Sequence, residues 1–148
     1  MDPSLHRQLA AQLFNHVWSL LDKSQRTAED YLEMIHAAHA SRYHWGIVGT
    51  AKEWSVGEWQ ISQVYAVLNR PEPAAYHADR SLKFAQNPGV GAFYVGYAYE
   101  ALARAHSLSG DQPEYDRCLA DAKSLLDKIE DAEERKTLAD DLASLARP

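Results

Sequence analysis

The sequence predicts an all-α protein. Apolar residues recur every three or four positions along most of the chain, and no stretch shows the two-residue alternation that is typical of a half-buried strand. Proline and glycine interrupt the pattern at spacings that suit ordinary globular helices. With 148 residues, 46% of them hydrophobic, the chain is long enough to bury a core of its own. We therefore expect one helical domain over residues 1–148.

The first expected helix covers about Pro3–Leu21, and the second covers about Thr27–Ile47. Asp2 is placed to cap the first helix, in whose opening turn a proline is well tolerated. Thr27 and Asp30 have the spacing of a capping box, with aspartate instead of the usual glutamate. The second helix is expected to end at two glycines, Gly46 and Gly49.

The third helix is expected to follow Thr50 as its N-cap and to reach Leu68, because two prolines come soon afterwards. The fourth covers about Pro73–Ala85 and ends before an Asn-Pro-Gly turn. The fifth covers about Gly91–Leu108 and ends at Gly110.

The sixth and seventh helices are expected at about Pro113–Ile129 and Ala132–Leu145. Short connections make neighbouring helices antiparallel hairpins. The hairpins are expected at about 3–47, 51–86 and 91–129, and the acidic segment at about 131–146 suits a capping helix at the end of a stack.

The hairpins also repeat. Residues 98–111 read AYEALARAHSLSGD, and Tyr115, Leu119 and Ala122 follow in the next helix. The last seven of the fourteen residues are echoed 41 positions earlier by residues 64–70 and more faintly by residues 17–23. This pattern resembles the tetratricopeptide repeat. The resemblance implies a right-handed stack of three hairpins plus the capping helix, and a compact bundle of the same helices is the alternative.

In tetratricopeptide proteins the first helix of each hairpin lines a concave groove, which commonly binds extended peptides. The resemblance therefore implies a non-catalytic interaction or scaffold module. It would bury a partner segment against Trp59 and Tyr97, with Arg104 and Glu100 setting polarity and register. A homodimer that covers the apolar ends of the stack is a second version. The groove positions carried over from the family are Gln12, His16, Trp59, Gln63, Tyr97, Glu100 and Arg104.

Charge narrows the class of partner. The chain has 15 basic and 21 acidic side chains, a net charge of −6, and residues 111–148 carry most of the excess. No basic stripe is present to bind a nucleic-acid backbone or an anionic membrane surface. A protein or a peptide is therefore the expected partner.

The single cysteine, Cys118, argues against a disulfide framework and against a cysteine-based zinc site. It falls on an apolar helix face, so we interpret it as a small buried hydrophobic residue rather than a nucleophile. The first residues lack the basic flank and apolar core of a secretory signal. We expect a cytoplasmic protein without a cofactor.

A cluster of polar residues carries the alternative function, a small metal-binding or catalytic helical protein. If the second and third helices form a tight pair, Arg42 and His39 lie close to Glu58, whose charge needs a partner on an apolar face. We favour a structural network. The alternative assigns a metal to His36, His39 and Glu58. A ligand sensor that acts with another chain is a third alternative.

Overall fold

The structure is a computed structural model that describes residues 1–145, and within them it contains seven α-helices and no strand. The all-α prediction is confirmed. None of these helices is both long and apolar enough to cross a membrane. The elements are α1 (Pro3–Leu21), α2 (Ala28–Val48), α3 (Ala51–Val67), α4 (Pro71–Ala85), α5 (Ala92–Ser109), α6 (Gln112–Ser124), the 3-10 turn η1 (Leu126–Lys128) and α7 (Ala132–Leu145).

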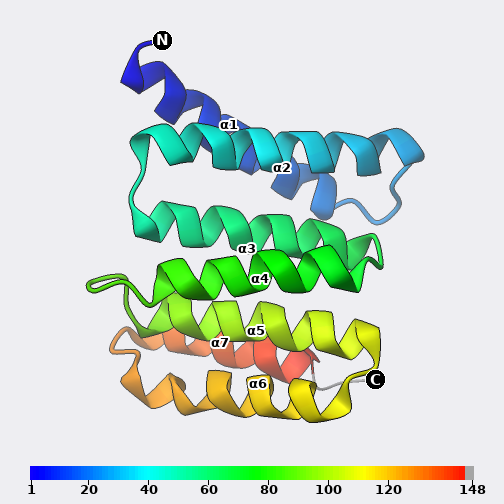
Figure 1. The fold of residues 1–148 in the computed structure, drawn as a ribbon, viewed down its shortest axis with the longest axis vertical. Helices are drawn as coiled ribbons and strands as arrows, with labels where there is room; N and C mark the ends of the chain where they lie inside the picture. The colour runs from blue at the N-terminus through cyan, green and yellow to red at the C-terminus, as the bar shows by residue number, and fades with distance from the viewer. Residues whose placement is uncertain (146–148) are drawn as a thin grey trace.

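The helices pack mostly against their neighbours in sequence and lie across the long axis of the molecule (Figure 1). Helix α1 with α2 forms one end, and α6 with α7 forms the other. Helices α1, α3, α5 and α7 also contact one another in succession, whereas within residues 1–145 the backbones of α2, α4 and α6 do not. The odd-numbered helices thus form one layer, and the even-numbered helices form a second layer beside it.

The first two helices begin as the sequence predicts. The Asp2 carboxylate accepts a hydrogen bond from the Ser4 backbone N–H at 2.9 Å. The capping box of Thr27 and Asp30 is complete, because each side chain accepts a hydrogen bond from the other residue's backbone N–H. The prediction that Gly46 ends the second helix is wrong, since α2 continues through it to Val48.

Two other boundaries differ from the prediction. Helix α4 begins at Pro71 rather than Pro73, because prolines at the first and third positions of a helix lack only N–H groups that the helix does not use. Helix α6 ends at Ser124, and a 3-10 turn then directs the chain so that Ile129 is buried. The predicted capping helix corresponds to α7, and its last predicted residue, 146, lies outside the described residues.

The turn between α5 and α6 requires a glycine. Gly110 has a φ of 78°, in the left-handed region, and the following N–H of Asp111 bonds to the carbonyl of His106 at 3.0 Å. This closes α5 in the manner that favours glycine over any residue with a Cβ. Asp111 then caps α6 by accepting the N–H of Glu114 at 3.2 Å.

The interior of the protein contains one cluster of buried alanines and two clusters that include larger apolar residues. Alanines are buried at the α3–α4–α5 contact, and larger apolar residues lie between α1, α2 and α3 and around α7. Buried serines complete the packing: Ser62 donates to a carbonyl of α4, and Ser41 donates to a carbonyl of α1. Because these hydroxyls bond the facing backbone, the helices approach closely without leaving the serine hydroxyls unpaired.

Truncation of Leu138 tests whether α7 is an integral part of this core. Its side chain is fully buried, and a Cβ on Gly96 of α5 would lie 2.5 Å from it. We expect Leu138→Ala to lower the free energy of unfolding by about 3 kcal/mol, measured by urea denaturation. Leu32→Ala, at a leucine that is 59% exposed, is the matched control and should cost less than about 0.5 kcal/mol. Equal losses in the two variants would mean that α7 does not contribute to the core.

Candidate functional site

A groove of about 470 Å³ lies on the odd-numbered layer. Each of the four odd-numbered helices contributes to it, and its walls are mainly aromatic and aliphatic. The lining residues are Trp18 of α1, Ser55, Val56 and Trp59 of α3, Ser81 of α4, Phe93, Tyr94 and Tyr97 of α5, and Thr137 and Asp141 of α7. Two residues predicted from the sequence, Trp59 and Tyr97, therefore line the same groove.

The aromatic rings of the groove form a continuous series across three helices. The ring centroids of Trp18 and Trp59 are 5.7 Å apart, as are those of Trp59 and Tyr97. Phe93 lies one turn before Tyr97 on α5, and their centroids are 5.1 Å apart in an edge-to-face arrangement. These distances are typical of favourable aromatic pairs, so each ring holds the next in position.

Glu100 holds the indole ring of Trp59 in position. Its side chain is 1% exposed, and it accepts hydrogen bonds from the indole N–H of Trp59 at 3.2 Å and from Arg104 at 2.6 Å. The resemblance places Glu100 on the groove surface, but in the structure its carboxylate is buried and makes its hydrogen bonds inside the protein. Glu100 is thus a positioning residue for Trp59.

Arg104 and Gln63 lie one helical turn beyond this bond. The second terminal nitrogen of Arg104 and the side-chain oxygen of Gln63 are both buried without a hydrogen-bond partner in the described residues. Neither side chain is part of the groove lining. Both residues therefore lie outside the aromatic wall of the groove.

Tyr97 joins the groove to α7. Its hydroxyl donates to the Asp141 carboxylate at 2.5 Å. Burial and this carboxylate raise the pKa of Tyr97 far above its ordinary value, so the hydroxyl remains a donor. The sequence indicated α7 only as a cap, and Asp141 and Thr137 of the groove wall were missed for that reason.

The residues predicted from α1 do not line the groove. Gln12 and His16 are exposed, and His16 instead lies 3.1 Å from Glu33 of α2. Trp18 takes the place beside Trp59, at the same 41-residue offset that relates Trp59 to Glu100. Counting back 41 residues from Trp59 leads to Trp18, so this offset is the sequence signal that would have identified Trp18 as a groove residue.

A second cluster surrounds Glu58 between α2 and α4. The carboxylate is 7% exposed and lies 3.7 Å from Arg42, 3.4 Å from His77 and 3.3 Å from Arg80. The predicted proximity of Arg42 and Glu58 is therefore present. The pairing of α2 with α3 does not predict the contacts of Glu58 with His77 and Arg80, because both of these residues belong to α4.

His39 joins this second cluster indirectly. Its ring bonds the Tyr65 hydroxyl at 2.9 Å and lies 5.4 Å, centroid to centroid, from the ring of His77. Tyr65 in turn stacks on His77. Burial, together with the neighbouring His77, lowers the pKa of His39 below its ordinary value. The expected direct link between His39 and Glu58 is replaced by this chain of rings.

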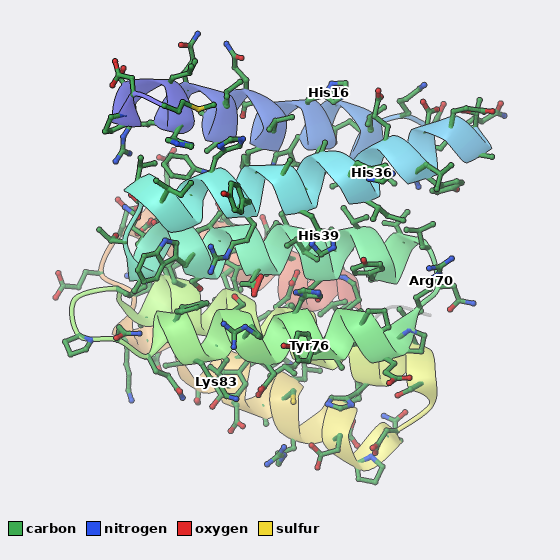
Figure 2. All side chains as sticks on the ribbon, turned by 45° about the horizontal axis from the view of Figure 1, so that its top comes forward. His16, His36, His39, Arg70, Tyr76 and Lys83 are labelled. Carbon is green, nitrogen blue, oxygen red and sulfur yellow. The ribbon has the colours of Figure 1, made fainter. Side chains whose placement is uncertain are left out.

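The alternative metal set is dispersed in the structure. His36 and His39 lie one turn apart on α2, where Figure 2 labels both, and His36 is exposed. The donor atoms of His36, His39 and Glu58 do not all lie within 4.8 Å of one another. Among the described residues, three donors of different side chains converge only at His106, Glu114 and Cys118.

Comparisons with known proteins add no family. The chain matches no protein-family model, no curated protein and no solved structure.

Glu58 makes the stability of the protein depend on pH. Burial alone would raise the pKa of this carboxyl, but His77, Arg42 and Arg80 outweigh it and hold the pKa below its usual 4.5. A carboxylate with a lowered pKa stabilises the fold above pH 4.5, and this contribution disappears as the pH falls through the folded-state pKa. Glu58→Gln should therefore cost about 2 kcal/mol at pH 7 by urea denaturation, and progressively less below pH 4.5.

Glu33→Gln, at an exposed carboxylate beside His16, is the control and should change stability little at either pH. A loss for Glu58→Gln that is equally large at pH 7 and in acid would contradict the charge-based explanation.

Proposed function

We propose that the protein is a non-catalytic interaction module whose helices form a tetratricopeptide-like stack and whose odd-numbered layer binds a segment of a partner protein. The observation that carries the proposal is the aromatic groove, which side chains from all four odd-numbered helices build. Its volume of about 470 Å³ suits a few apolar side chains. The 41-residue offset between Trp59 and Glu100, which are in contact, supports the repeat.

The groove is well suited to binding because its anchors are already held in place. Trp59 is fixed by Glu100, and Tyr97 is fixed by Asp141. Rigid aromatic side chains lose little conformational entropy when a partner covers them, so more of the burial energy appears as affinity. Glu100 and Arg104 then set the register indirectly, through the orientation of Trp59.

The charge beside the groove indicates the chemistry of the partner. A shallow acidic depression shares Phe93 and Thr137 with the groove, and its other lining residues are Asp131, Glu133, Glu134, Lys136 and Asp140. Four carboxylates and one amine there favour a positively charged group. The proposed partner is therefore a peptide segment with apolar side chains next to lysine or arginine, which agrees with the expectation that nucleic acid does not bind.

The alternative function at the second cluster has less support. Glu58 is already surrounded by three basic side chains, and such a network stabilises a buried carboxylate without any ligand. The cluster joins α3 to α2 and α4 through these contacts of Glu58, so we assign it a structural role.

Selection from a random-peptide phage library on the full-length protein tests the proposal. Enriched peptides should combine aromatic or aliphatic residues with lysine or arginine. Trp59→Ala and Tyr97→Ala should weaken binding of a labelled, selected peptide by roughly 30-fold or more in fluorescence anisotropy, because buried aromatic anchors dominate interface energies.

Trp54→Ala is the matched control. Trp54 bonds the Trp45 carbonyl and packs on Phe84, and it is not part of the groove lining. Val56→Glu keeps both aromatic anchors and places a charge in the groove, so it should also abolish binding. It tests the groove independently should the other two variants unfold. Peptides whose affinity is unchanged by Val56→Glu would show that the groove is not the binding surface.

Self-association is the second version of the proposal, in which the partner is another copy of this chain. Leu32, Tyr43 and Ile47 of α2 are exposed at the end of the stack opposite α7. Light scattering of the full-length protein distinguishes the versions. A mass of one chain, 16.6 kDa, would restrict the partner to a different protein.

A further inference from the structure

Three side chains with different metal-binding groups converge where α5 meets α6. The imidazole of His106, the carboxylate of Glu114 and the thiol of Cys118 each place one donor atom within 4.8 Å of the other two. His106 lies in the last turn of α5, and the two other residues lie one turn apart on α6. The left-handed Gly110 between the helices is what brings them together.

The burial of this group is graded. Cys118 is 2% exposed, whereas His106 and Glu114 are half-buried. The thiol therefore forms the inner end of the group, and an ion can reach it past the two outer side chains. The only ion pair of Glu114 within the described residues is with Arg117, which is 66% exposed and free to move away.

We propose that His106, Glu114 and Cys118 bind a single divalent transition-metal ion, with zinc as the best match. Thiolate and imidazole favour zinc over magnesium or calcium, which take oxygen ligands. Three protein ligands leave a fourth tetrahedral position for water. The thiol proton is released to solvent when the metal binds, because the thiolate is the ligand.

The distances require only a small adjustment. In a tetrahedral zinc site with bonds of about 2.0–2.3 Å, neighbouring donor atoms are about 3.5 Å apart. The donor atoms lie no more than 4.8 Å apart, so closing to the tetrahedral spacing needs only side-chain rotations, and His106 and Glu114 are partly exposed and can turn. A site with one thiolate does not need the several cysteines that a cysteine-only zinc site requires.

The site would link the end of α5 to the beginning of α6. It lies at the other end of α5 from Phe93, so the metal would stabilise the last hairpin without occupying the groove. Metal binding and peptide binding are therefore separable, and the proposed site stands independently of the proposed function.

Titration of the full-length, untagged protein with Co²⁺ tests the site, because cobalt reports its ligands in absorption. We expect saturation at one Co²⁺ per chain, a thiolate-to-cobalt charge-transfer band, d–d bands of tetrahedral intensity, and displacement of the bands by Zn²⁺. Cys118→Ser should remove the charge-transfer band, and His106→Asn should weaken cobalt binding at least tenfold. Far-ultraviolet circular dichroism establishes that both variants are folded.

His16→Asn is the matched control, because His16 and Glu33 form an exposed imidazole–carboxylate pair without a thiol. Its cobalt spectrum should equal that of the parent protein. The proposal is overturned if the parent shows no charge-transfer band, or if Cys118→Ser or His106→Asn binds Co²⁺ as the parent does.

Discussion

The burial of α3 is the constraint on which the rest of the structure depends. This helix contacts α1, α2, α4 and α5, so nearly every side of it is covered. Fully buried polar residues of α3 therefore need partners on the facing helices: Gln60 donates to a carbonyl of α1, and Ser55 donates to a carbonyl of α4. Each of these bonds also sets the register between α3 and a neighbour, which determines what the two surfaces of the protein present.

Glu58 and Trp59 show how one helix serves both surfaces. Adjacent residues on a helix point about 100° apart, so the carboxylate faces the cluster between α2 and α4, and the indole faces the groove. Both side chains are held in position by interactions with charged groups. Arg42, His77 and Arg80 surround Glu58, and Glu100 accepts the indole N–H of Trp59. A change at either residue therefore affects the packing of α3 as well as its local surface.

Helix α7 contributes to the core, to the groove and to the charge beside it. It buries Leu138 against α5, binds the Tyr97 hydroxyl through Asp141, and adds acidic side chains beside the groove. The acidic excess of the last part of the chain thus lies next to the aromatic wall. This proximity gives the proposed partner a chemical description, an apolar segment with a basic residue, that the aromatic wall alone does not supply.

Local signals in the sequence determined the helices and most of their ends, because caps, prolines and glycines act within a few residues. The complete capping box at Thr27 and the left-handed turn at Gly110 are such cases. The resemblance to a helical repeat also predicted that Trp59 and Tyr97 share a surface, and both line the groove. Only the tertiary structure decided that Trp18 rather than His16 stands beside Trp59, that Glu100 is buried, and that His77 and Arg80 reach Glu58. These outcomes depend on the register between helices distant in sequence, which side chains set only once the helices pack together.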